Sequence, residues 1–177
     1  MNKTESEKYL LSFCIPTYNR PKEFERMLTG VLPQITKEVE IVIRDDSTND
    51  ETKKIFDRLI GGKDINFRYI RGEKIGLDAA CLFLIENASG NYIWWFSDDD
   101  ELRAGAISHV LEIIKNFPET YFIWANFDFQ TSGNPAVNRD EGFFKDRNDV
   151  LESLGTGIGF VSSLIFDKER LPRHCHS

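Results

Sequence analysis

The chain has 177 residues, enough for one compact domain, and its 41% hydrophobic and 29% charged residues are ordinary for a soluble globular protein. Its formal net charge of −7 argues against general nucleic-acid binding, which needs a basic face. The longest apolar runs, such as residues 79–85, are far shorter than the roughly 20 residues that cross a bilayer, and residues 1–8 lack the apolar core of a secretory signal.

The three cysteines, Cys14, Cys81 and Cys175, have no metal-type spacing and cannot all pair with one another. Cys14 falls in a predicted strand and Cys81 on a predicted helix, so we expect buried, reduced thiols. Reduced thiols fit a reducing cytoplasm. We therefore expect a cytoplasmic protein without a membrane-spanning segment, and peripheral association at the inner face of the cell membrane stays open.

Strand-like and helix-like patterns alternate along the chain. The first strand is expected over residues 10–15, and a helix with one apolar stripe follows Pro21. Further strands are expected over residues 39–44, 66–70, 92–96, 121–127 and 160–166. Helices are expected after the turn at 45–50, from about Leu77, over 106–114 and over 149–154, and residues 130–148 predict a long loop. This alternation predicts an α/β fold with a mainly parallel sheet flanked by helices.

The apolar run over residues 92–96 ends abruptly in Asp98, Asp99 and Asp100. Adjacent carboxylates repel one another, and a divalent cation, which prefers oxygen ligands, removes that cost. Two other polar segments, residues 16–20 and 45–47, also follow predicted strands. Because the C-terminal ends of parallel strands share one edge of the sheet, where open α/β folds bind ligands, we expect the three segments to converge.

Each of these segments suits a nucleotide. Tyr18 can pack against a base, and the backbone beside it can hydrogen-bond the edge of the base. A carboxylate such as Asp46 can accept from a base N–H or a ribose hydroxyl. Asp98 and Asp100 can ligate Mg²⁺ or Mn²⁺ that bridges two phosphates. Together the residues predict a site for a nucleotide-activated substrate.

Each segment also has a plainer interpretation. Asn19 and Pro21 are typical of a helix start, Asp45 and Asp46 of a helix cap, and residues 98–100 of a solvated turn. Such coincidences need not recur at three equivalent strand ends, so the combined pattern favours a ligand site.

Four stretches in order resemble the family 2 glycosyltransferases, which have the GT-A-type nucleotide-diphospho-sugar transferase fold. They are residues 12–20, residues 41–50, the Gly76-Leu77 turn with residues 88–92, and residues 97–100. Their order and spacing match the family from about residue 10 to residue 115. The run from Ala88 into Asp98, Asp99 and Asp100, hereafter the acidic turn, resembles abequosyltransferase-like members most. These members act in O-antigen assembly.

The resemblance implies a single GT-A domain over residues 1–177, with the nucleotide-sugar donor-binding half over 1–115 and the start of an acceptor half over 116–177. It implies a metal-dependent, inverting transfer of a sugar from a nucleoside-diphosphate donor to a saccharide or lipid-linked acceptor, in cell-surface polysaccharide or O-antigen synthesis. The implied ligands of Mn²⁺ or Mg²⁺ are Asp98 and Asp100. The implied nucleotide-binding residues are Pro16, Thr17, Tyr18, Asp45, Asp46, Asp98 and Asp99.

The chain departs from the family pattern in two places. Many members carry an Arg-Asn pair where Cys81 and Leu82 stand here, and Arg71 and Lys74 before that helix are either compensating charges or solvated surface. The family's catalytic base lies in an acidic motif beyond the last strand, so we assign no catalytic base and expect a truncated chain. None of the available carboxylates sits in a matching motif: Asp128, Asp140, Glu141, Asp146 and Asp167.

Three other functions compete with that of a glycosyltransferase. The missing base keeps a catalytically inactive sugar-nucleotide-binding module open. A nucleotidyltransferase would carry a Gly-rich, basic loop after the first strand, and residues 16–20 contain no glycine. A receiver-like signalling domain needs its acidic pair after the first strand, whereas the acids here follow the second and fourth. The sequence predicts neither the donor base, the sugar and the acceptor nor the oligomeric state.

Overall fold

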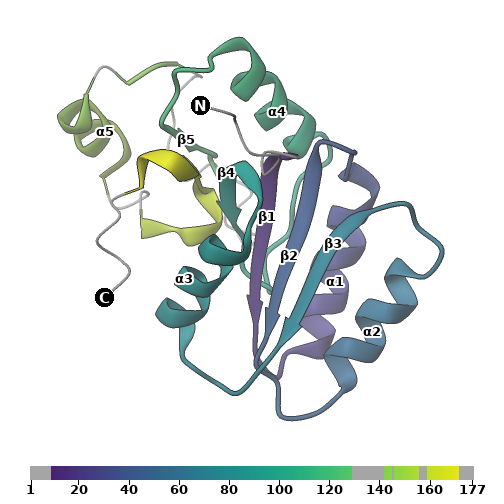
Figure 1. Cartoon of the computed structure of the whole chain (residues 1–177). Helices are drawn as coiled ribbons and strands as arrows, with labels where there is room; N and C mark the ends of the chain where they lie inside the picture. Colours follow the sequence, from purple (N-terminus) through teal and green to yellow (C-terminus); the bar gives the residue numbers. More distant parts are fainter. Residues whose placement is uncertain (1–8, 129–141, 145, 156–158, 172–177) are drawn as a thin grey trace, which may run out of the picture.

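The computed structural model describes residues 9–128, 142–144, 146–155 and 159–171. Within them, a six-stranded sheet has the order β3-β2-β1-β4-β6-β5 and carries helices on both faces (Figure 1). The parallel strands are β1 (Tyr9–Thr17), β2 (Val39–Asp45), β3 (Asn66–Arg71) and β4 (Gly90–Trp95). The predicted α/β fold with a mainly parallel sheet is confirmed.

Helices cover the two faces of the sheet unequally. α1 (Pro21–Val31), α2 (Glu51–Ile60) and α4 (Ala106–Asn116) pack on one face, and α3 (Leu77–Asn87) packs on the other. Successive side chains of β1 point to opposite faces of the sheet. Phe13 therefore belongs to the core that packs against α1, α2 and α4, and Cys14 belongs to the core that contains Leu84 of α3. This two-sided burial explains why β1 reads as a continuous apolar run.

The last part of the described chain completes the same sheet. β6 (Leu164–Asp167) runs antiparallel to β4, and β5 (Phe122–Trp124) runs antiparallel to β6. Both strands are shorter than the predicted ranges. In the range that contains β6, residues 161–163 form a 3₁₀ helix instead, and its Ser162 carbonyl accepts from the Trp94 indole N–H at 2.9 Å. The other helices that the structure describes are η1 (Leu32–Gln34), α5 (Arg147–Leu154), η3 (Val161–Ser163) and η4 (Lys168–Arg170).

The structure bears on two predictions, one about the cysteines and one about membrane-spanning helices. Cys14 and Cys81 are buried free thiols, as predicted, and burial raises the pKa of the Cys81 thiol to about 11. Cys175 lies outside the described residues, as does most of the predicted loop over 130–148. Among the helices that the structure describes, none is long and apolar enough to cross a membrane.

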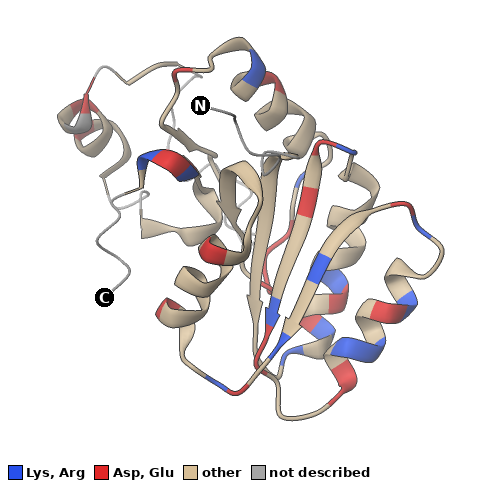
Figure 2. Cartoon of the chain, viewed as in Figure 1, with Lys and Arg blue, Asp and Glu red and all other residues tan. Residues whose placement is uncertain are grey.

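The order of the strands reverses beside β1. The chain runs from β1 through β2 to β3 on one side and then crosses over to β4 on the other side of β1. In open α/β sheets, ligands bind in the crevice beyond the C-terminal ends of the strands at such a point. The segments that follow β1, β2 and β4 therefore meet where a ligand site is expected, and Figure 2 shows charged residues of both signs near the ends of β2 and β3.

Candidate functional site

A cavity of about 340 Å³ opens at the ends of β1, β2 and β4. Its wall combines the three predicted segments with the loop before α3, the start of α3 and one residue of η3. The lining residues are Pro16, Thr17, Tyr18, Arg20, Asp46, Lys74, Gly76, Leu77, Ala80, Phe96, Ser97, Asp98 and Val161. The structure thus brings five of the predicted nucleotide-binding residues to one cavity: Pro16, Thr17, Tyr18, Asp46 and Asp98.

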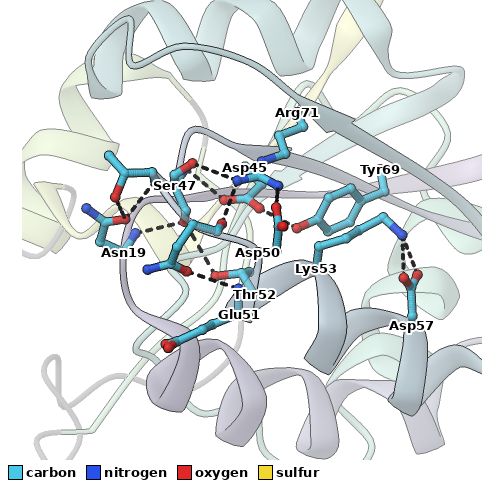
Figure 3. Close-up of polar contacts among 12 residues, drawn as sticks. Asn19, Asp45, Ser47, Asp50, Glu51, Thr52, Lys53, Asp57, Tyr69 and Arg71 are labelled. Carbon is cyan, nitrogen blue, oxygen red and sulfur yellow. Dashed lines mark hydrogen bonds and ion pairs between the residues drawn. The ribbon is translucent and has the colours of Figure 1, made fainter.

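The segment after β1 supplies an aromatic ring and a polar link to the next segment. The Tyr18 ring lines the cavity, and the Lys74 ammonium lies 4.2 Å from its centroid. Asn19 has a positive φ of 54°, a conformation that asparagine tolerates better than most residues. Its N–H donates to the Ser47 hydroxyl at 2.9 Å, and its side-chain oxygen accepts from the Thr48 N–H at 2.9 Å (Figure 3).

Asp45, at the end of β2, has its carboxylate directed into the protein. One oxygen accepts from the Ser47 N–H at 2.9 Å, and the other accepts from the Tyr69 hydroxyl at 2.5 Å (Figure 3). Burial raises the pKa of Tyr69, and the hydrogen bond to Asp45 raises it further. Asp45 is fully buried and does not line the cavity, so its contacts hold the turn after β2 in shape.

Asp46 points to the other side and lines the cavity. Its Oδ1 accepts from Arg44 Nε at 2.5 Å, and its Oδ2 accepts from the Ile75 N–H at 3.2 Å. Neither Asp45 nor Asp46 caps α2, where the Glu51 N–H donates to the Asn49 side chain instead. The helix-cap interpretation of the Asp pair is therefore wrong.

The two basic residues before α3 have different environments. Arg71 forms an ion pair with Asp50 and donates to the carbonyls of Ser47 and Asn49, so it holds the turn before α2 (Figure 3). Lys74 lines the cavity beside Tyr18. Lys74 is therefore a cation that an anionic ligand in the cavity would meet, whereas Arg71 is structural.

Asp98 is the buried member of the acidic turn, with 4% of its surface exposed. The Thr17 hydroxyl donates to its Oδ2 at 2.7 Å, and Arg20 Nη1 lies 3.4 Å from its Oδ1. Burial raises the pKa of Asp98, and the contacts from Thr17 and Arg20 partly offset this rise. The solvated-turn interpretation therefore does not hold for Asp98.

Asp99 and Asp100 face different partners. Asp99 accepts from Arg20 Nη1 at 2.6 Å and from the Ser97 hydroxyl. The hydrogen bond from Ser97 lowers the pKa of Asp99 most, and Arg20 lowers it further. Asp100 Oδ2 accepts from the Ser162 hydroxyl at 2.5 Å, and burial raises the pKa of Asp100. Neither residue lines the cavity itself, so both lie on the turn beside it.

The carboxylates of Asp98 and Asp100 are candidate ligands for a divalent cation. Within the described ranges, no three His, Cys, Asp or Glu side chains gather as a complete protein-made metal site. A magnesium-type ion does not need one, because it retains waters and binds through one or two carboxylates plus substrate phosphates. Burial raises the pKa of both Asp98 and Asp100 and so favours their neutral forms. A cation beside them would have the opposite effect and favour their charged forms. Asp98, which lines the cavity, could supply one such carboxylate, and Asp100 lies on the turn beside it.

The candidate carboxylates for a catalytic base are engaged elsewhere. Asp128 pairs with Arg103, and Asp146 caps α5 by accepting from the N–H groups of residues 148 and 149. Asp167 accepts from the Glu169 N–H at 2.9 Å. Asp140 and Glu141 lie outside the described residues. None of the three candidates that the structure describes is therefore assigned as a base.

Sequence reasoning missed several contributors to the site, among them Arg20, Ser162 and Val161. Arg20 neutralises the acidic turn, Ser162 binds Asp100, and Val161 lines the cavity. Arg20 stands at the end of the polar segment over residues 16–20, so its position beside the site follows from that segment. Ser162 and Val161 reach the site only through the antiparallel placement of β6, which no local pattern reveals.

These features define a GT-A-type α/β domain with a candidate nucleotide site at its switch point. The chain belongs to glycosyl transferase family 2, whose model matches residues 12–169.

Named relatives are bacterial glycosyltransferases. The chain is 27% identical to abequosyltransferase RfbV of Salmonella typhimurium, over 91% of this chain and 54% of that protein. It is 31% identical to the GalNAc(5)-diNAcBac-PP-undecaprenol beta-1,3-glucosyltransferase of Campylobacter jejuni, over 58% of this chain and 33% of that protein. The chain thus spans about half the length of the Salmonella relative.

Solved structures share the fold at low identity. TarS of S. aureus, residues 1–349 in complex with UDP-GlcNAc, superposes with a TM-score of 0.67 at 18% identity, over 89% of this chain and 45% of that one. The mannosyltransferase PcManGT of Pyrobaculum calidifontis, in complex with GDP-Man and Mn²⁺, gives a TM-score of 0.63 at 16% identity, over 90% and 45%. At this identity the likeness establishes the fold alone.

Proposed function

We propose that this chain carries the donor site of a glycosyltransferase that moves a sugar from a nucleoside diphosphate to an acceptor. The observation that carries the proposal is the single cavity lined from the ends of β1, β2 and β4. In this proposal the base lies against Pro16 and Tyr18, and Asp46 accepts from a base N–H. Thr17 and Asp98 face the ribose and the phosphates.

We further propose that the reaction depends on Mn²⁺ or Mg²⁺ and inverts the anomeric centre. Asp98 and Asp100 would hold the cation, which would stabilise the charge of the leaving diphosphate. Arg20 holds the carboxylates of Asp98 and Asp99, and Lys74 offers a cation at the cavity wall. Proton removal from the acceptor hydroxyl would fall to a carboxylate on the acceptor side.

The acceptor is proposed to be a saccharide or a lipid-linked saccharide in cell-surface polysaccharide or O-antigen synthesis. Support comes from the names of the two relatives, one an abequosyltransferase and the other acting on a PP-undecaprenol substrate. Such an acceptor would place the protein at the cytoplasmic face of a membrane, and the buried free thiols of Cys14 and Cys81 fit that compartment. Co-sedimentation with vesicles that contain polyprenyl-diphosphate lipid tests this location.

A second candidate function is a binding module that holds a sugar nucleotide without turnover. The observation that favours it is the engagement of Asp128, Asp146 and Asp167 in ion pairs and caps. Nucleotide binding without release of sugar from a bound donor, measured on the full gene product with acceptor present, would support the module.

Calorimetric titration of UDP, CDP, GDP and dTDP, each with and without Mn²⁺, tests the donor-site proposal. We expect one nucleotide to bind more tightly than the others and to bind more tightly when Mn²⁺ is present. Absence of binding by all four to protein shown to be folded, repeated on the full gene product, would refute the proposal.

A further inference from the structure

Arg44 is an unusual residue for its position. It is the last residue but one of β2, directly after the apolar run of residues 41–43, and it is 7% exposed. A buried guanidinium must find partners for its charge and its N–H groups. Its partners include Asp46, which lines the cavity, and the loop before α3 that carries the lining residue Lys74. Resting on the proposed donor site, we propose that Arg44 is a positioning residue that sets discrimination among nucleotide bases.

The guanidinium joins the carboxylate of Asp46 to the loop before α3. Arg44 Nε donates to Asp46 Oδ1 at 2.5 Å, and Arg44 Nη2 donates to the Glu73 carbonyl at 3.1 Å. The Ile75 N–H then donates back to Asp46 Oδ2 at 3.2 Å. These contacts form a closed ring of hydrogen bonds that fixes both oxygens of Asp46 and the loop on either side of Lys74.

Two further contacts hold the guanidinium in place. It lies over the Phe83 ring of α3, with 4.4 Å between its Cζ and the ring centroid. Gly72 lies against it so closely that a Cβ added there would stand 2.3 Å from Nη2 and 2.7 Å from Cζ. Any side chain at position 72 would therefore push the guanidinium out of its ring of contacts.

The consequence concerns selectivity more than overall binding. Nucleotide bases differ in which N–H groups they present along an edge, so a carboxylate distinguishes them only if its oxygens are held in one orientation. The acidic turn that would hold the diphosphate is bound by Thr17 and Arg20 instead. Loss of the Arg44 contacts should therefore blur the choice of base while leaving the diphosphate end intact.

Two substitutions disturb this ring without removing the Asp46 carboxylate. Arg44→Lys keeps the charge but cannot bridge Asp46 and Glu73 with a planar fork. Gly72→Ala keeps every charge and displaces the guanidinium by sterics, at a position where its backbone φ is not positive. The matched control is Arg68→Lys on β3, because Arg68 is exposed and, among the described residues, its hydrogen bonds go to Asn87 and Ser89.

The test measures dissociation constants of UDP, CDP, GDP and dTDP with Mn²⁺ on the wild type and the three variants, with circular dichroism to show folding. We expect Arg44→Lys and Gly72→Ala to weaken the preferred nucleotide about 10- to 100-fold, the range of charged hydrogen bonds, and the other nucleotides by much less. The double variant should lose less than the sum of the two single losses, because both act on one contact. Arg68→Lys should match the wild type.

The outcomes separate this inference from the function on which it rests. If the wild type binds none of the four nucleotides, the proposed donor site fails. If the wild type binds one nucleotide selectively and the folded variants keep the same ratio between nucleotides, the role of Arg44 is refuted and the donor site stands. An equal loss for all four nucleotides would also refute it, because it would indicate general support of the fold. Gly72→Ala decides the matter if Arg44→Lys does not fold.

Discussion

The Thr17 hydroxyl donates a 2.7 Å hydrogen bond to the Asp98 carboxylate, although the two residues are 81 positions apart in the sequence. Thr17 ends β1, and Asp98 follows β4, so this bond spans the point where the strand order reverses. Both side chains are buried, and the acceptor is a carboxylate whose pKa burial already raises. The bond therefore fixes the acidic turn to the sheet at the mouth of the cavity.

Thr17→Val removes this donor with little change of shape. We expect a loss of about 1–3 kcal/mol in the free energy of unfolding, the usual cost of depriving a buried charged group of a hydrogen bond. The loss should be larger at neutral pH than at acidic pH, because the pKa of Asp98 rises further and protonation relieves the cost. Urea unfolding at the two pH values measures it.

Thr29→Val on α1 is the matched control, because the Thr29 hydroxyl donates to the Glu25 carbonyl of its own exposed helix turn. If Thr17→Val is no more destabilising than Thr29→Val, the bond does not hold the acidic turn.

The affinity for the metal should depend on pH at values above about 3.9, the ordinary pKa of an aspartate. Burial raises the pKa of Asp98 and Asp100, so both keep a proton to higher pH than an exposed aspartate. A cation needs the deprotonated forms, so its affinity should rise with pH through that raised range, with release of protons on binding. In the metal-free protein these groups contribute stability at low pH that is lost as the pH rises through the same range.

Calorimetry of Mn²⁺ in the presence of the preferred nucleotide, in buffers of different ionisation enthalpy, measures both the affinity and the proton release. A Mn²⁺ affinity that stays flat from about pH 4 to pH 7 would contradict the role of these carboxylates.

Ser162→Ala tests the support of Asp100 from η3. The Ser162 hydroxyl donates to Asp100 at 2.5 Å and accepts from the Ser97 N–H at 2.9 Å, so it fixes the carboxylate against the turn. Its removal should weaken Mn²⁺ binding about 10-fold or more, as loss of an orienting group around a metal ligand does, and should move the pH dependence upward. The matched control is Ser108→Ala on α4, whose hydroxyl donates to the Gly105 carbonyl, and it should leave both the affinity and the pH dependence unchanged. Equal Mn²⁺ affinities for the two variants would contradict this role.

Local pattern was enough to predict the parallel part of the fold. β1, β2 and β4 are apolar runs that end in polar residues, and the C-terminal ends of parallel strands share an edge. The meeting of Tyr18, Asp46 and Asp98 in one cavity follows from that rule without further information.

Other features depend on tertiary contacts that no local pattern contains. The sequence could not distinguish Asp45 from Asp46, because adjacent side chains at a strand end point in opposite directions and either could face the cavity. Lys74 looks like solvated surface until the loop folds over Tyr18. The buried Arg44 was visible as a charge within an apolar strand, but its partners in the loop at 73–75 were not.

Asp100→Asn, compared with Asp57→Asn, tests the donor site most directly. Asp57 is an exposed partner of Lys53 on α2 and serves as the matched control. The measurement is calorimetric titration of the preferred nucleotide with and without Mn²⁺. We predict that Mn²⁺ tightens binding to the wild type and to Asp57→Asn, and that this tightening disappears in Asp100→Asn while metal-free binding persists. Full retention of the Mn²⁺ effect in Asp100→Asn would contradict the proposal that the acidic turn holds the cation of the donor.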